Sequence, residues 1–342
     1  MNSNNTNIFF HAPKELTTDA FLVWLFYFLD SDKIYESAKQ DLFDMVVLKE
    51  ADKGRSVSNI CLKRQENHVD VILSFVFTDE NITQDVIFEN KTWSSYHSDQ
   101  LMEYKSKYPN SYRYLYYKLA YINSQEKQYV TDCGYDIITA KMISSAIEKH
   151  ISLHPLIQMY NDYLTQSFIN PIETFHDKLF IEKDYSILWG AEAQKYLCDI
   201  IVQKMNEQHF PYLEIRNGFS MGGSPWTQID IAEKKEGYWE KLFWRVDIRS
   251  NKFYIRLNLY SDPANDFEID QKMKRKDYLR ERINNFPEVS NFKIGLVTNG
   301  VKESEIVIFF LEENNLSDLI SAIPAISKKI VDVFNNLEES LW

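Results

Sequence analysis

The chain has 342 residues, 44% of them apolar and 26% charged, and its 50 acidic and 38 basic residues give a net charge of −12. This composition is typical of a globular protein with room for two domains. The acidic balance excludes a protein that coats nucleic acid or membrane over its whole surface, although it leaves a local basic groove open.

The sequence predicts neither a secretory leader nor a membrane segment. The N-terminal stretch MNSNNTNIFF lacks a basic region and a small-residue cleavage site. The longest apolar run, residues 20–29, is far shorter than the roughly 20 residues that cross a bilayer. The cysteines Cys61, Cys133 and Cys198 are scattered and odd in number, which favours reduced thiols. We therefore expect a cytoplasmic protein without a membrane partner.

The first part of the chain predicts two helices followed by three strands. Residues 18–29 are apolar on every side, which is typical of a buried helix. Residues 33–47 have the pattern of a second, amphipathic helix. The period then changes to two, and strands are predicted at 57–64, 68–77 and 85–91.

The next elements complete the predicted first domain. A helix is expected from about residue 98 to 107, then a tyrosine-rich strand at 112–122 and a strand at 135–139. Two helices are expected over 140–167. The order helix, three strands, helix, strand predicts an α/β domain with a mixed sheet and helices packed on its faces.

Residues 170–183 change in character, so we place a boundary there and predict domains at 1–168 and 184–342. The second domain is predicted as a further α+β unit whose role its pattern does not reveal. Its expected elements are a helix at 187–208, short strands near 212 and 227, strands at 241–248 and 252–260, a charged helix at 266–284, strands near 293 and 306, and a helix from 316.

The stretch VIFENKTW, residues 86–93, starts as a buried strand and ends in charged residues. Alternate residues of a strand share a face, so Glu89 and Lys91 project together and Asn90 projects to the other side. Asp70 opens the preceding strand, and an antiparallel hairpin would bring it beside them. Two carboxylates at a sheet edge can hold Mg²⁺, and a lysine there can activate water and stabilise charge on a phosphate.

This constellation resembles the PD-(D/E)xK nuclease superfamily. The motif reads VD…ENK in this chain, with Val69 where the family pattern has proline, Asp70 next, and Glu89-Asn90-Lys91 closing the following strand. Gln100 and Tyr104 on the next predicted helix look like the QxxxY motif of recombination-type exonucleases in the superfamily. The resemblance implies a restriction-endonuclease-like core, a mixed sheet flanked by helices.

The leader KELTTDAFLVWLFYFLD resembles the first helix of one bacterial branch of the superfamily, in which a glutamate can complete the metal site. Glu15 and Asp19 both match this position, and we favour Glu15. The similarity covers about residues 13–150 and does not extend to the second domain.

The resemblance implies a metal-dependent nuclease that hydrolyses phosphodiester bonds in DNA, with Mg²⁺ as cofactor and Mn²⁺ as a substitute, and it leaves a homodimer open. The implied residues are Asp70, Glu89 and Lys91 for catalysis, Asp70, Glu89, Glu15 and the backbone carbonyl of Asn90 for the metal, and Gln100 and Tyr104 for substrate binding or support.

Simpler interpretations of the same residues stay open at this point. Glu89 and Lys91 could form a surface ion pair at the end of a strand, and such pairs contribute only about 0–1 kcal/mol. Asp70 could be an ordinary turn residue, and Gln100 with Tyr104 an ordinary polar pair on a helix. The alternative function is a catalytically inactive, nuclease-like binding or scaffolding protein.

Residues 272–282, KMKRKDYLRER, hold six basic residues against two acidic ones. Such a segment could contact phosphates, with Tyr278 stacking on a base. The interpretation that we favour is a solvated helix with ion pairs along its surface.

Overall fold

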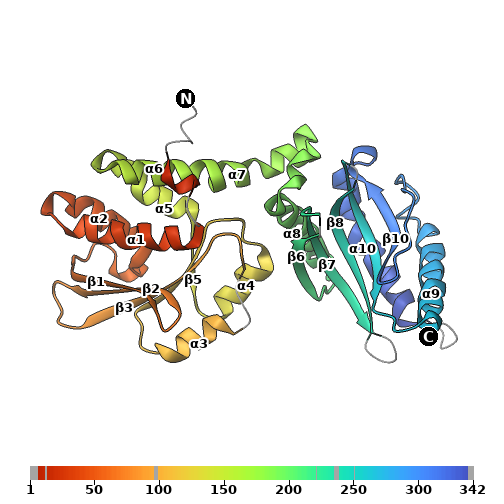
Figure 1. Cartoon of the computed structure of the whole chain (residues 1–342), viewed down its shortest axis with the longest axis horizontal. Coiled ribbons are helices and arrows are strands. Elements are labelled where there is room, and N and C mark those ends of the chain that lie inside the picture. The colour runs from red at the N-terminus through yellow and green to blue at the C-terminus, as the bar shows by residue number, and fades with distance from the viewer. Residues whose placement is uncertain are drawn as a thin grey trace. The chain divides into compact units, whose positions relative to one another are not determined.

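The computed structural model describes residues 7–11, 14–95, 99–220, 222–234, 239–249 and 251–337. Contacts divide the chain into two compact units, Met1–Glu173 and Thr174–Trp342, which we call unit 1 and unit 2. Each unit contains a five-stranded sheet accompanied by helices (Figure 1). The expected combination of a mixed sheet with helices, followed by a second α and β unit, is confirmed at this level.

The sheet of unit 1 has its strands in chain order, β1-β2-β3-β4-β5. The first three strands pair antiparallel, whereas β3, β4 and β5 pair parallel. Because parallel strands run in one direction, the carboxyl ends of β3, β4 and β5 meet at one edge. The bounds are β1 Val57–Glu66, β2 Val69–Phe77, β3 Thr83–Lys91, β4 Arg113–Lys118 and β5 Asp136–Thr139.

Helices cover both faces of this sheet (Figure 1). A large apolar core joins one face to α1, α2, α5 and α6, and a smaller core joins the other face to α3 and α4. The bounds are α1 Lys14–Asp30, α2 Glu36–Leu42, α3 Gln100–Lys107, α4 Ser124–Asp132, α5 Ala140–Ile147 and α6 Pro155–Leu164. Short 3-10 or π-helical turns lie at Ile8–Phe10, Lys33–Tyr35, Phe43–Val47, Glu50–Asp52, Glu148–Leu153 and Thr165–Ile169.

The tyrosine-rich strand is shorter than predicted, and a helix follows it that the sequence argument missed. The strand ends at Lys118, and the chain then turns into α4. Asn123 caps this helix, since its side chain accepts a hydrogen bond from the backbone N–H of Glu126. The helix escapes prediction because SQEKQYVTD is short and mostly polar, and its first turn depends on that cap.

The segment in which we expected a boundary is helical. It comprises α7, Asn170–His176, and a π-helical stretch, Asp177–Glu182. Lys183 follows in the left-handed conformation, with φ of 55°. The division between the two units falls inside α7.

Unit 2 is built on an antiparallel sheet in the order β10-β9-β8-β7-β6. Its elements are α8 Ala191–Glu207, β6 Glu214–Phe219, β7 Pro225–Lys234, β8 Glu240–Arg249, β9 Lys252–Ser261, α9 Asp266–Asn284, β10 Glu303–Phe310 and α10 Leu316–Asn335, with 3-10 turns at Tyr185–Trp189 and Leu311–Glu313. Both α8 and α10 pack against β7. The strand expected near residue 293 is wrong, because Ile294 makes only an isolated bridge to Phe309.

The basic segment in α9 faces the interior of unit 2. Lys272, Arg275 and Lys276 are buried. Arg275 donates to both carboxylate oxygens of Glu240, at 2.6 and 3.0 Å, and Lys272 donates to the backbone carbonyl of Val301 at 2.6 Å. For these three side chains, both the phosphate-contacting face and the solvated helix are wrong. The partners of Lys272 and Arg275 lie far away in the sequence, where helix periodicity carries no signal.

The described helices include none that is long and apolar enough to cross a membrane. The three cysteines carry free thiols, with Cys61 exposed and Cys133 and Cys198 buried. They form no disulfide framework, so the core of each unit rests on packing rather than on covalent links.

Candidate active site

The hairpin formed by β2 and β3 brings the first candidate residues together. Its register pairs Val71 with Phe88, which places Asp70 opposite Glu89 at the next position. The backbone N–H of Asn90 donates to Oδ2 of Asp70 at 2.8 Å. The predicted antiparallel hairpin is therefore confirmed, and Asp70 is held against the end of β3.

Glu89 and Lys91 form a buried ion pair. Lys91 Nζ lies 2.6 Å from Glu89 Oε1, and the two side chains are only 8% and 1% exposed. Both oxygens of Glu89 are buried, and within the described part of the chain neither accepts a hydrogen bond of regular geometry. The interpretation as a surface ion pair is therefore wrong, because the strand remains buried to its last residue.

The Glu89 carboxyl has an unusual acidity. Its pKa is raised to about 8, chiefly by burial and also by the nearby charge of Asp70, while the Lys91 ammonium acts in the opposite direction. At neutral pH this carboxyl is therefore largely protonated. Because a cation bound beside it would favour its charged form, the strand end is a candidate position for a cation.

Asp19, in α1, reaches the same strand end from the other face of the sheet. The Asn90 side chain donates through Nδ2 to Asp19 Oδ1. Gln65 donates to Asp19 Oδ2 at 3.4 Å and to Asp70 Oδ1 at 3.0 Å, so it links the two acids. Burial raises the pKa of Asp19 to about 6, and the charge of Asp70 contributes.

Glu15, which we favoured as the acid from this helix, lies one helical turn before Asp19, and residues four apart share a helix face. Its side chain lies outside the described residues. Of the two acids, Asp19 is the one whose position beside Asp70 and Asn90 is seen directly.

Gln100 and Tyr104 connect Lys91 to the rest of unit 1. Lys91 Nζ donates to Gln100 Oε1 at 3.3 Å, and Gln100 Nε2 donates to the Tyr104 hydroxyl at 2.6 Å. Tyr104 in turn donates to the backbone carbonyl of His68, at 2.5 Å, in the turn between β1 and β2. Burial raises the pKa of Tyr104 to about 12, so its hydroxyl stays protonated. Both residues therefore also make contacts outside their own helix, which an ordinary polar pair on a helix does not require.

Replacing Tyr104 with phenylalanine is expected to lower the free energy of unfolding by about 1–2 kcal/mol, because the His68 carbonyl and the Gln100 amide lose a partner in part-buried hydrogen bonds. Urea unfolding measures the loss. Tyr108→Phe is the matched control, since Tyr108 accepts an exposed hydrogen bond from Asn67 in the same turn. Equal losses for both variants would contradict the inferred role of the Tyr104 contacts.

A second buried ion pair, which the sequence argument missed, lies on the neighbouring strand. Lys118 is the register partner of Lys91, and its Nζ lies 3.2 Å from Glu126 Oε1 in α4. Tyr116 also donates to Glu126, at 2.6 Å, and Lys118 donates to the backbone carbonyl of Ser94. These contacts fix the segment that follows Lys91. The alternation of Tyr116 and Lys118 in β4 was the available signal, but their partner Glu126 belongs to the missed helix.

The chain was compared with protein-family models, with curated proteins and with solved structures, and nothing matches it.

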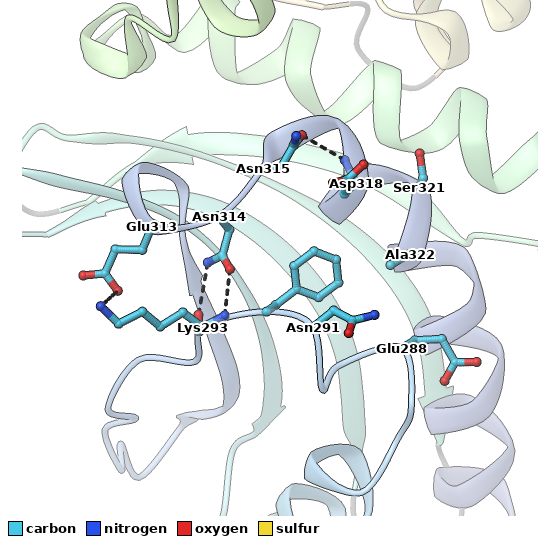
Figure 2. A pocket seen from close by; sticks show the side chains of 10 residues that line it. Glu288, Asn291, Lys293, Glu313, Asn314, Asn315, Asp318, Ser321 and Ala322 are labelled. Atoms are coloured by element: carbon cyan, nitrogen blue, oxygen red, sulfur yellow. Dashed lines mark hydrogen bonds and ion pairs between the residues drawn. The ribbon is translucent and has the colours of Figure 1, made fainter.

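Unit 2 contains a pocket of about 690 Å³ beside the start of α10 (Figure 2). Several of its polar side chains already have partners. Lys293 pairs with Glu313 at 3.2 Å, Asn314 bonds to both backbone groups of Lys293, and Asn315 caps α10. None of the buried unpartnered polar atoms of the described residues lies in its lining. The predicted chemistry lies in unit 1, so we place the candidate active site at β2 and β3.

Proposed function

We propose that unit 1 is a Mg²⁺-dependent nuclease of the PD-(D/E)xK type that hydrolyses phosphodiester bonds in DNA. The observation that carries the proposal is the buried Glu89–Lys91 pair facing Asp70, which brings two carboxyl groups and an ammonium group to one strand end. The order from α1 to β4 is two helices, three antiparallel strands, a helix and a parallel strand. This order fits the restriction-endonuclease-like core that the resemblance implies and supports the proposal.

The donor atoms at this site suit a hard cation. Asp70 and Glu89 offer carboxylate oxygens. The backbone N–H of Asn90 faces Asp70. In an antiparallel ladder, the carbonyl of a residue faces the same neighbouring strand as its N–H, so the Asn90 carbonyl also lies on the side of Asp70. The described residues contain no group of three or more His, Cys, Asp or Glu arranged for a metal. Mg²⁺ is commonly held by one or two carboxylates together with waters, and this set fits that requirement.

Several residues of the chain have separate roles around that ion. When bound, Mg²⁺ would stabilise negative charge on the phosphate and would make a water molecule more acidic. Lys91 offers a fixed positive charge to the attacking water or to a phosphate oxygen, because Gln100 and Glu89 hold its ammonium from two sides. Asn90 and Gln65 hold Asp70 in a single orientation. The site is thus arranged before substrate arrives.

A cleavage assay on linear, circular and single-stranded DNA with Mg²⁺ or Mn²⁺ tests the proposal. We expect cutting that EDTA abolishes and that Lys91→Ala and Asp70→Ala reduce by at least about 10²–10³-fold, since each removes charge at the reacting phosphate. Lys63→Ala is the matched control, because Lys63 lies on β1 and its side chain is 54% exposed. Folded wild-type protein that cuts nothing with either metal would favour the inactive, nuclease-like binding protein instead.

A further inference from the structure

A second cavity, of about 250 Å³, lies in unit 1 where β4 and β5 end. Its walls are mostly apolar and come from the segment after β4, the start of α5 and the helical stretch after α6. Leu119, Tyr121, Ile122, Phe168, Ile169 and Ile172 contribute the apolar side chains. The volume is below the roughly 300–1,000 Å³ of sites for drug-sized ligands, so it suits one small ring system.

Two residues that line this pocket form backbone hydrogen bonds with the end of the strand that carries Glu89 and Lys91. The backbone N–H of Leu119 donates to the carbonyl of Lys91, and that of Ala120 to the carbonyl of Thr92, both at 3.1 Å. Adjacent strands lie about 4.8 Å apart. The pocket therefore begins one strand away from the end of β3, at the same edge of the sheet. Its walls belong mainly to the core on the α5 and α6 face, whereas Lys91 contacts Gln100 of α3 on the other face.

An aromatic surface joins the two places. Trp93 follows Lys91 by two residues and is 38% exposed. Its ring centroid lies 5.1 Å from that of Phe168, with the planes inclined by 40°, and Phe168 lines the pocket. Phe168 itself is buried, so the exposed ring of Trp93 is the face on which a base of a single strand can stack.

The charges at the rim indicate what the pocket can hold. Lys141 and Glu173 both line it and form an exposed ion pair at 2.6 Å. This pair carries no net charge, so the pocket itself does not favour a phosphate. An uncharged, planar and largely apolar group fits better, and a nucleobase next to a phosphate at Lys91 has those properties.

We propose that this pocket binds one unpaired nucleobase of the DNA strand whose phosphodiester lies at Glu89 and Lys91, with Trp93 packing beside that base. The inference rests on the proposed nuclease function and names its substrate class as DNA with an unpaired nucleotide, either a single strand or an opened end. Because stacking and burial hold the base, selectivity among the bases is small.

The test is a binding measurement that does not depend on cleavage. Fluorescence anisotropy follows a labelled single-stranded oligothymidylate with Ca²⁺ in place of Mg²⁺, and a parallel series carries one abasic site at successive positions. We expect wild-type protein to bind roughly 5- to 100-fold more weakly when the abasic site falls at one particular position. The ratio of the affinities for the intact and the abasic oligonucleotide should be nearly independent of salt concentration, because the rim of the pocket is neutral. Each affinity by itself should fall as salt concentration rises.

Two variants remove the site in different ways. Trp93→Ala deletes the adjacent ring and Ile172→Trp fills the pocket, so both should abolish the position-dependent loss, whereas Trp93→Phe should keep it. Trp189→Ala, which deletes an exposed tryptophan in unit 2, should behave as wild type. If Ile172→Trp lowers the melting temperature sharply, Trp93→Ala alone decides.

The outcomes separate this inference from the nuclease itself. Wild-type protein that cuts DNA but binds every abasic oligonucleotide equally well would overturn the pocket assignment and leave the nuclease standing. The same holds if the loss persists in both variants, or if only duplex DNA is bound. A position-dependent loss without any cutting would support the pocket and contradict the nuclease. Absence of both binding and cutting overturns both.

Discussion

Replacing Glu89 with glutamine is expected to remove a fall in stability that the wild-type protein shows between about pH 5 and pH 8. Burial raises the pKa of Glu89 from its ordinary 4.5 to about 8, so the folded state binds the more protons in this range. The contribution of Glu89 to the free energy of unfolding is then fully present below the ordinary pKa. It decreases as pH rises above that value, by at most about 1.4 kcal/mol per pH unit. Glutamine does not titrate. Between pH 5 and pH 8, the difference in free energy of unfolding between the two proteins should therefore change by up to about 4 kcal/mol in favour of the variant.

Urea unfolding at pH 5, 6, 7 and 8 in EDTA measures this difference. Asp19, with its pKa of about 6, titrates in both proteins and cancels. Added Mg²⁺ should flatten the wild-type curve, because a bound cation favours the charged carboxylate, and should leave the variant unchanged. Glu66→Gln, at an exposed position on β1, should follow the wild type. Parallel curves for wild type and Glu89→Gln would contradict the raised pKa.

The second large effect is expected at Glu240, which meets the buried guanidinium of Arg275 through two hydrogen bonds. Both side chains are almost completely buried, at 0% and 1% exposure. Glu240→Gln leaves the positive charge of Arg275 without its carboxylate, beside Lys272, whose pKa burial already lowers to about 8. Breaking a buried pair in this way costs about 3–5 kcal/mol. The loss should appear as a lower urea midpoint of the full-length protein.

Glu207→Gln serves as the control for this change. Glu207 pairs with Lys204 at 2.7 Å on the surface of α8, and its side chain is 60% exposed, so the expected loss is at most about 1 kcal/mol. Removing both partners with Glu240→Gln and Arg275→Met should recover most of the stability, because the buried charge of Arg275 is removed together with that of Glu240. If Glu240→Gln costs no more than the surface variant, the inferred importance of the pair is wrong.

The parts of unit 1 that the sequence predicts well are those whose pattern is local. The apolar residues of α1 recur on every side of the helix, and the period of two across β2 and β3 specifies both the faces and the hairpin. Since a register slip by one residue would move every side chain to the other face of the sheet, the position of Asp70 opposite Glu89 follows from the same pattern.

Other features depend on contacts between distant parts of the chain, and the periodicity of the sequence does not indicate such contacts. Glu15 and Asp19 lie on one helix face, so spacing alone could not choose between them. Lys118 appears in the sequence as one more residue of a tyrosine-rich strand, and its role depends on Glu126 in a helix too polar to be recognised. In α9, the orientation of Arg275 is decided by Glu240, 35 residues earlier.

The hydrogen bond between Asn90 and Asp19 has a consequence for how this sequence can diverge. Asn90 projects away from Glu89 and Lys91, and its amide is the short-range donor to a carboxyl that is almost wholly buried. An apolar residue at position 90 would leave that carboxyl without this donor, and an apolar residue at position 19 would leave the amide without its acceptor. In homologous chains we therefore expect the two positions to change together, so that an alignment would show them as a coupled pair 71 residues apart.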